Sequence, residues 1–494
     1  NSKFASANDP RLLETMKNVI PDSVIAHTEI VEEDPRTGRI AICLDDILAK
    51  DAFRLNNLIS YYYTNEMWSR MLSGYAIDDE QSQVKGADVF NDHIEVKADM
   101  TFISENPSGS AVVTDPRNLQ LSVNYSFAKL PASEGFTPRP ADPRVGYFET
   151  AQVDWSLKGP EAPLKRFIRK WRLEKSNPAL AASPVKNPVV YWLDTSIPEE
   201  YRQTIREAIL TWNKAFARVG LLGAIAVKDA PAPRRTANAQ VQEIANDDYN
   251  PFGLRFNVVQ WNMPVDHVAA WGPSRSDPRT GEIINAAVSF AVQMSRINLT
   301  MLETTPPTTA KTRIKTSHDT PTAQHCAYGA ALAQEAAFGL SLGKAGREFN
   351  DAEREDLIKD YIKDVILHEI GHTLGLRNNF KATTWRSLQE TQVAQDGLVS
   401  ASVMDYAPIN IAAPGQKQGP YFQTDLGPYD YWAIAYGYTP VDGLDKAAVK
   451  AKLKTILDEA GRPGLAYATD EDASRMDPDA QQWKLGNDIV GFAK

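Results

Sequence analysis

A long amphipathic segment that ends in two histidines constrains the fold of this chain more than any other feature. From Leu357 to Ile366, apolar residues recur at helical spacing with charged residues between them. This periodicity predicts a helix over about 351–375. His368 and His372 then project from one face of the helix, one turn apart, where they can bind a single metal ion.

The residues at the two ends of this segment fit the same prediction. Asn350 or Asp351 can cap the start of the helix, and Glu353 stands three residues after Asn350, as in a capping box. Gly375 offers a residue at which the helix can end and the chain can turn. The segment therefore has a start signal and a stop signal that agree with its periodicity.

Glu369 directly follows the first histidine and completes the pattern H-E-x-x-H. On a helix, this pattern is typical of zinc-dependent proteases, in which the glutamate takes a proton from a water on the metal. The alternative is a core helix that carries two histidines by chance, in a chain that has only seven. We therefore expect His368 and His372 to bind Zn²⁺ and Glu369 to be the general base.

A catalytic zinc site has three protein ligands, so two histidines leave it incomplete. The extended pattern H-E-x-x-H-x-x-G-x-x-H puts the third ligand at position 378, which is Asn378 here, and no histidine follows His372. An amide oxygen is a poorer zinc ligand than imidazole. Three alternatives follow: Asn378 binds weakly, a carboxylate such as Asp405 or Glu390 replaces it, or the site is impaired.

Composition bounds the remaining possibilities. The 494 residues suggest two to four domains, and the net charge of −10 argues against a general nucleic-acid binder. No run is long and apolar enough to cross a membrane. Cys43 and Cys326 leave the redox compartment open, and no signal segment follows Asn1, as expected for a mature product or an excised piece.

The chain divides into a β-rich part, residues 1–162, and a second part, residues 163–494. In the first part we expect a hairpin around Asp34–Gly38 and strands at 93–102 and 119–127. Its isolated histidines, His27 and His93, are expected to be structural.

In the second part, the order strand, helix, strand predicts a parallel pair with helices covering a sheet. The expected segments are 189–193, 199–219 and 224–227. The run from Ile283 to Val292 is a candidate edge strand beside the site, able to hold an extended peptide by main-chain hydrogen bonds. Residues 325–342 are Ala-rich and predict a helical lid or packing insert, and the acidic cluster 470–472 predicts a solvated loop.

The string Ser402-Val403-Met404-Asp405-Tyr406, located after the extended zinc motif, resembles the Met-turn of metzincins. Residues from about 163 to 494 resemble bacterial zinc-dependent metalloproteases with a Met-zincin domain, and the preceding part resembles the β-rich domain of that family. The strings that carry the resemblance are Arg166–Lys175, Asp277–Ile284, His368–Phe380, Ser402–Tyr406 and Gly427–Trp432, with Ala141–Phe148 in the preceding part. Family members usually read H-N-F where this chain has Asn378-Asn379-Phe380.

The resemblance implies an α+β fold in which an N-terminal β-rich domain precedes a metzincin-like catalytic domain. The catalytic domain is expected to contain a mixed twisted sheet, an active-site helix at about 351–375 and a Met-turn at 402–406. The resemblance also implies that Met404 lies beneath the zinc ligands and that Tyr406 reaches the metal or the oxyanion, although Tyr406 can equally be a core residue.

For function, the expectation is a zinc-dependent endopeptidase that cuts proteins or peptides, impaired by Asn378. The alternative is a weak or inactive protease-fold protein that binds peptides or a cell-surface partner. The resemblance further implies a location outside the cytoplasm, secreted or periplasmic, with no nucleic-acid partner.

Overall fold

The fold is taken from a computed structural model of the chain. The structure describes residues 10–19, 24–55, 75–105, 115–131, 135–153, 164–231, 233–235, 242–244, 249–262, 270–291, 328, 332, 335, 336, 339, 350–412, 415–473 and 477–492. Cys326 and most of the predicted helical insert 325–342 lie outside these residues.

The chain forms two compact units, each of which is described by itself. One contains residues 7–131 and 252–254, and the other contains residues 132–251 and 255–494 together with the first six residues. Residues 135–153 thus fold with the unit that carries His368 and His372, and the boundary at residue 162 stays a prediction about domain organisation.

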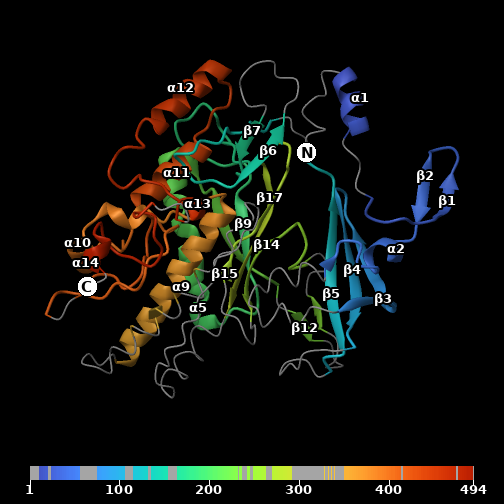
Figure 1. The fold of residues 1–494 in the computed structure, drawn as a ribbon, viewed down its shortest axis with the longest axis horizontal. Coiled ribbons are helices and arrows are strands. Elements are labelled where there is room, and N and C mark those ends of the chain that lie inside the picture. Colours follow the sequence, from blue (N-terminus) through green and yellow to red (C-terminus); the bar gives the residue numbers. More distant parts are fainter. Residues whose placement is uncertain are drawn as a thin grey trace. The chain divides into compact units, whose positions relative to one another are not determined.

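The smaller unit is built on an antiparallel meander of three strands in the order β3-β4-β5 (Figure 1). The predicted hairpin and the two predicted strands are confirmed. Ala98, Met100 and Phe102 on the central strand form its buried core. The elements of this unit are α1 (Pro10–Val19), β1 (Ile30–Asp34), β2 (Arg39–Ile42), α2 (Asp45–Leu48), β3 (Ala76–Val89), β4 (His93–Ile103) and β5 (Asn118–Ala128).

The larger unit contains a mixed six-stranded sheet in the order β11-β9-β14-β17-β15, with β16 also paired to β17. The first four strands are parallel, whereas β15 and β16 run antiparallel to β17. The strands are β9 (Val189–Leu193), β11 (Ile225–Asp229), β14 (Asn257–Asn262), β15 (Ala270–Trp271), β16 (Ser274–Ser276) and β17 (Ile283–Ala291).

This strand order confirms the predicted parallel pair, β9 with β11, and corrects the predicted edge strand. The run from Ile283 to Val292 is not an edge, because its β17 lies between β14 and the β15–β16 segment. The sequence of β17 alone could not show this, since the neighbours of a strand are set by how distant segments pack.

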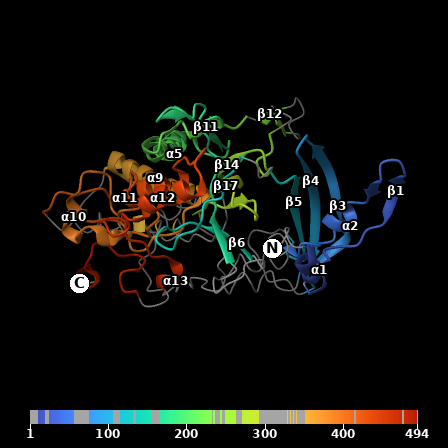
Figure 2. The ribbon, with the colours of Figure 1, turned by 90° about the horizontal axis from the view of Figure 1, so that it is seen from above.

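Two helices cover the sheet and lie side by side in both ribbon views (Figures 1 and 2). These are α9 (Asp351–Thr373) and α5 (Glu199–Thr211), which a turn at Trp212 separates from α6 (Asn213–Arg218). Trp212 is fully buried, and its indole Nε1 donates to the carbonyl of Leu367 at 3.2 Å. Tyr191 on β9 shares a 2.6 Å hydrogen bond with Thr373, so both the partner helix and the sheet fix α9.

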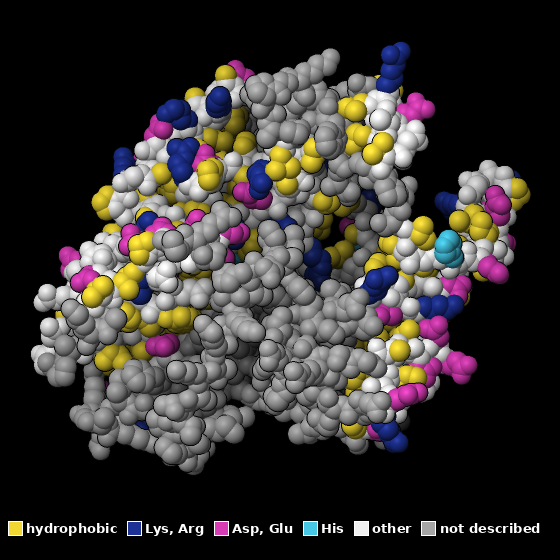
Figure 3. Space-filling model, viewed as in Figure 1, with side chains coloured by type: hydrophobic (Ala, Val, Ile, Leu, Met, Phe, Trp, Pro, Cys, Tyr) yellow, Lys and Arg dark blue, Asp and Glu magenta, His cyan; other side chains and the backbone are white. Residues whose placement is uncertain are grey.

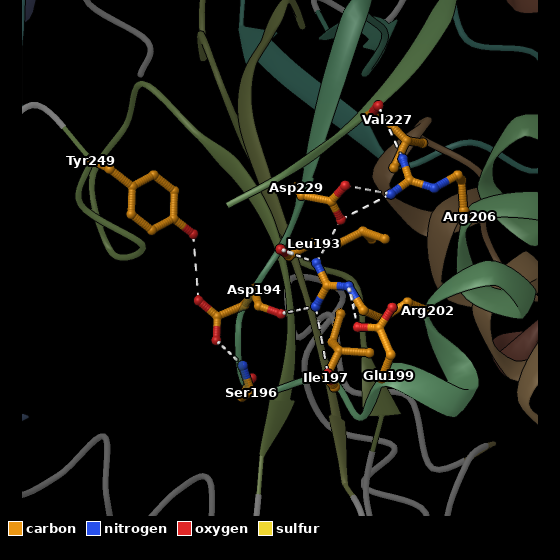
Figure 4. Close-up of polar contacts among 10 residues, drawn as sticks. All are labelled: Leu193, Asp194, Ser196, Ile197, Glu199, Arg202, Arg206, Val227, Asp229 and Tyr249. Atoms are coloured by element: carbon orange, nitrogen blue, oxygen red, sulfur yellow. Dashed lines mark hydrogen bonds and ion pairs between the residues drawn. The ribbon is translucent and has the colours of Figure 1, made fainter. Parts of the chain in front are cut away.

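A polar clamp fixes α5 on the carboxyl ends of β9 and β11 (Figure 4). Arg202 donates to the backbone carbonyl of Asp194 at 2.9 Å and to the Asp229 carboxylate at 2.6 Å. Arg206, one turn further along, contacts both oxygens of Asp229. Because the guanidinium groups are already held by these acceptors, the clamp is structural.

The remaining elements of the larger unit surround the sheet and the two helices. They are β6 (Glu149–Val153), β7 (Leu164–Ile168), β8 (Ser183–Pro184), β10 (Leu221–Leu222), β12 (Pro233–Arg235), β13 (Gln242–Ile244), the 3₁₀ turn Ala382–Trp385, α10 (Leu388–Val393), α11 (Pro428–Tyr438), α12 (Lys446–Leu457), α13 (Asp470–Ala473) and α14 (Ile489–Phe492). Around α12, basic side chains lie among acidic ones (Figure 3). Within the described part of the chain, no helix has both the length and the apolar character that a membrane span requires.

Candidate metal centre

The helix that carries the two histidines begins and ends as the sequence predicts. The side chain of Asn350 accepts from the backbone N–H of Glu353, and the Glu353 carboxylate accepts from the N–H of Asn350, both at 3.0 Å. The helix ends at Thr373, and Gly375 then turns the chain with a φ of +99°. A Cβ atom at Gly375 would lie 2.0 Å from the carbonyl oxygen of Arg169, so only glycine fits this turn.

His368 and His372 lie together on the inner face of α9, with ring centroids 4.7 Å apart. The Nδ1 atom of His368 lies 2.8 Å from the carbonyl oxygen of Val403, and that of His372 lies 2.8 Å from the carbonyl oxygen of Leu376. Since a carbonyl oxygen can only accept, each Nδ1 must carry the hydrogen. Each neutral ring therefore keeps its lone pair on Nε2, which is the tautomer that a metal requires.

Burial keeps both rings neutral. The two histidines are 0% and 5% exposed, and removal from water disfavours the imidazolium form. It lowers the pKa of His372 to about 4 and moves the pKa of His368 well below its usual value. The two side chains are thus available as metal ligands without first losing a proton.

Met404 lies directly against the helix between the two histidines. A Cβ atom at Gly371 would lie 2.3 Å from Met404 Sδ and 3.1 Å from the indole ring of Trp212, so the glycine leaves room for the thioether. Met404 is fully buried. The methionine therefore provides an apolar surface against the backbone of the helix that carries the two histidines, and its role beneath a metal stays a prediction.

The turn that contains Met404 is held by Asp430, in the first turn of α11. Its carboxylate accepts from Ser402 Oγ at 2.6 Å, from the N–H of Val403 at 3.0 Å and from the N–H of Gly427 at 2.8 Å. Val403 is also the residue whose carbonyl accepts from His368. Asp430 thus holds the N–H of the same residue whose carbonyl oxygen orients the His368 ring.

Glu369 lies between the two histidines in sequence and faces the edge of the sheet. A Cβ atom at Gly272, between β15 and β16, would lie 2.3 Å from the backbone oxygen of Glu369 and 3.3 Å from its Oε2. Glu369 is fully buried. The edge segment beside the candidate general base is therefore β15–β16.

Two tyrosines pack on His368. Tyr328 stacks on its ring at 4.4 Å, and Tyr406 lies 5.6 Å from it, measured between centroids. Tyr328, Leu332 and Ala336 are buried in the core cluster, so the described face of the 325–342 segment is a packing surface. The position of Tyr406 beside His368 is compatible with both roles considered for it, and its catalytic role stays a prediction.

Asn378, at the position of the third ligand, lies beside the same histidine. Its side chain interacts with the His368 ring and raises the pKa of that ring, against the larger lowering by burial. The residue is 6% exposed, and among the described residues no hydrogen-bond donor reaches its Oδ1. A buried acceptor without a donor is costly unless a further group binds there, and a metal ion would satisfy it.

The carboxylates considered as replacements bind elsewhere. Asp405 accepts from the N–H of Thr383 at 2.7 Å and from Ser400 Oγ at 3.0 Å, and burial raises its pKa to about 6. Glu390 caps α10 through Ser387. Over the described ranges, no group of three His, Cys, Asp or Glu side chains forms a metal site, so neither carboxylate completes the histidine pair.

Several residues at this centre are not apparent from the sequence motif. Gly272 and Tyr328 precede α9, and Asp430 follows it at a distance, so no local spacing connects them to it. For Asp430 alone, the local sequence contains a recognisable signal, because Pro428 is typical of the first position of a helix and Asp430 then lies in its first turn.

Two family models match parts of the chain. Residues 350–494 match the model described as Met-zincin, and residues 1–176 match a domain of unknown function (DUF5117). The matched C-terminal residues thus form a domain of metzincin type. The described chain as a whole has the mixed helix and strand content of an α+β fold. No curated protein and no solved structure matches the chain.

Proposed function

We propose that the chain is a zinc metallopeptidase in which His368, His372 and Asn378 hold the metal and Glu369 is the general base. The observation that carries this proposal is the pair of Nδ1–H hydrogen bonds to backbone carbonyls, because they set both Nε2 atoms as ligands on one helix face. The acceptor at Asn378 Oδ1 supports the same set, since it lies buried beside His368.

Zinc, when bound, lowers the pKa of a water molecule and polarises the carbonyl group of the peptide bond. The chain's own residues do the rest of the chemistry. Glu369 takes the proton of the attacking water and passes it to the leaving amine. In this proposal, Tyr406 donates a hydrogen bond to the oxyanion, and Met404 keeps the floor of the site apolar.

A protein or peptide substrate would lie along the β15–β16 edge. In the described sheet, this segment pairs with β17 on one side only, which leaves main-chain groups on its other side for an extended peptide. Gly272, at the middle of the segment, brings that edge against Glu369. A substrate held there by main-chain hydrogen bonds would present a peptide bond next to the general base. A location outside the cytoplasm belongs to the same proposal.

The test compares the full chain with Glu369→Gln, using zinc content by mass spectrometry and the cleavage of a casein or peptide substrate. We expect the wild type to bind zinc and to lose activity on chelation, and Glu369→Gln to bind zinc with activity lower by roughly 10²–10⁴-fold. Glu355→Gln on the exposed part of the same helix, where Glu355 pairs with Lys359, is the matched control and should keep full activity.

Retention of full metal-dependent activity in Glu369→Gln would refute this mechanism. A second candidate, a peptide-binding protein that does not cut, is favoured by Asn378 at the ligand position. It predicts that the wild type binds zinc and peptide but releases no product.

A further inference from the structure

Asp470 lies at the start of α13, close to Asn378. The sequence assigns it to an acidic cluster that is expected to be solvated. Its carboxylate, however, accepts from Asn378 Nδ2 at 3.5 Å and from Thr469 Oγ1 at 3.2 Å. Asp470 therefore contacts the metal centre and does not simply face solvent.

The chemistry of the two side chains decides how the Asn378 amide is oriented. An ionised carboxylate can only accept hydrogen bonds, so the NH₂ group of Asn378 must face Asp470. The amide oxygen then faces the opposite way, toward the His368 ring with which the side chain interacts. The Nδ1 atom of that ring is already bonded to Val403, so Asn378 approaches the Nε2 side.

The remaining observation is that Asn378 Oδ1 is buried, and no donor in the described part of the chain satisfies it. An amide free to rotate could turn this oxygen away from the histidines. With its NH₂ group held by Asp470, the oxygen stays directed at the place where the two Nε2 atoms are available. In metal sites, residues that hydrogen-bond to the ligands commonly set the orientation of those ligands in this way.

On the basis of the proposed function, we propose that Asp470 is a positioning residue of the metal centre. Its carboxylate holds the Asn378 amide so that Oδ1 serves as the third ligand of a divalent cation bound by His368 and His372. The inference assigns a role to a residue outside the zinc motif, and it explains how an asparagine can complete a site that a histidine normally completes.

The neighbouring residue Glu471 offers a matched control. It carries the same charge, lies next to Asp470 and pairs with Arg377 at 2.7 Å, whereas Asp470 lies 3.5 Å from the same guanidinium. Replacing either residue by alanine removes one negative charge from the same helix, α13. Only the replacement of Asp470 removes an acceptor of Asn378.

The first measurement is Zn²⁺ binding to the metal-free full chain by calorimetry. We expect Asp470→Ala to weaken Zn²⁺ binding roughly 10–100-fold, and Glu471→Ala to stay within about twofold of the wild type. Asp470→Asn should keep most of the affinity, because its side-chain oxygen still accepts from Asn378. The double variant Asp470→Ala with Asn378→Ala should bind no more weakly than Asn378→Ala alone, since both changes remove the same ligand.

The second measurement needs no metal. In protein labelled with ¹⁵N-asparagine, the side-chain NH₂ signal of Asn378 is assigned by its loss in Asn378→Ala. It should shift in Asp470→Ala and stay in place in Glu471→Ala. If the wild type binds no Zn²⁺, the proposed function fails, and this signal alone decides whether Asp470 holds the amide.

The inference is overturned if the amide signal is unchanged in Asp470→Ala. It is equally overturned if Asp470→Ala binds Zn²⁺ like the wild type, or if Glu471→Ala weakens binding as much. Equal losses in Asp470→Ala and Asp470→Asn would show that only the charge matters, which also contradicts positioning.

Discussion

Gly375→Ala should be among the most damaging small substitutions in the domain, because two separate costs meet at this residue. Gly375 has a φ of +99°, a conformation that L residues rarely adopt. In addition, a Cβ atom there would lie 2.0 Å from the carbonyl oxygen of Arg169 and 3.1 Å from the ring of Tyr147. Backbone strain and a steric clash are therefore expected together.

The magnitude follows from these two contributions. A left-handed conformation costs an L residue about 1–2 kcal/mol, and forcing extra atoms into a packed interior costs about 1–3 kcal/mol. The neighbouring backbone cannot easily move away, because the N–H of Phe148 donates to the Gly375 carbonyl and the N–H of Arg169 donates to the Phe148 carbonyl, both at 2.7 Å. We expect Gly375→Ala to lower the free energy of unfolding by about 2–5 kcal/mol.

The turn at Gly375 also affects the metal centre. The next residue, Leu376, provides the carbonyl that accepts from His372 Nδ1, so a displaced turn should weaken Zn²⁺ binding as well. Urea denaturation followed by circular dichroism measures the first effect, and calorimetry measures the second.

Gly443→Ala is the matched control for the strain alone. Gly443 has a φ of +74°, and nothing lies within 4 Å of the position of its Cβ atom. This variant should lose only about 1–2 kcal/mol and should keep its Zn²⁺ affinity. If Gly375→Ala loses no more stability than Gly443→Ala, the clash with Arg169 is not the deciding effect and the reasoning is wrong.

Three further predictions concern the buried groups around the histidines. Burial raises the pKa of Asp364 on α9 from the usual 3.8 to about 8. Between pH 3.8 and about 8, the folded protein therefore keeps a proton that the unfolded chain has lost. The free energy of unfolding consequently falls as the pH rises through this range. In urea denaturation at pH 5, 6 and 7, the free energy of unfolding of the wild type should fall by about 1.4 kcal/mol per pH unit more steeply than that of Asp364→Asn. Equal slopes in the two proteins would contradict this prediction. Asp430→Ala leaves three hydrogen-bond donors without their acceptor. It should lower the free energy of unfolding, measured by urea denaturation, by about 3 kcal/mol or more. A loss below about 1 kcal/mol would show that other acceptors replace the carboxylate. Asn378→His should raise Zn²⁺ affinity measured by calorimetry by a large factor, because imidazole is the better ligand, and an unchanged affinity would place the third ligand elsewhere.

The sequence by itself determined the helix that carries the two histidines, including its capping box at Asn350 and its end before Gly375. These features depend on contacts three or four residues apart, so the local sequence contains all of their information. The same holds for the β1–β2 hairpin and for the order of strand, helix and strand around α5. Each of these predictions is confirmed by the helices and strands of the structure.

The tertiary structure decided the hydrogen bonds and strand neighbours that depend on residues distant in sequence. The carbonyl of Val403 sets the tautomer of His368, the β15–β16 segment and not β17 forms the edge of the sheet, and Asp470 contacts the amide of Asn378. No spacing rule connects these residues, because they meet only when the sheet, α9 and the C-terminal loops pack together. The motif therefore predicted two ligands and a base, and the packing around them determined how those side chains are oriented.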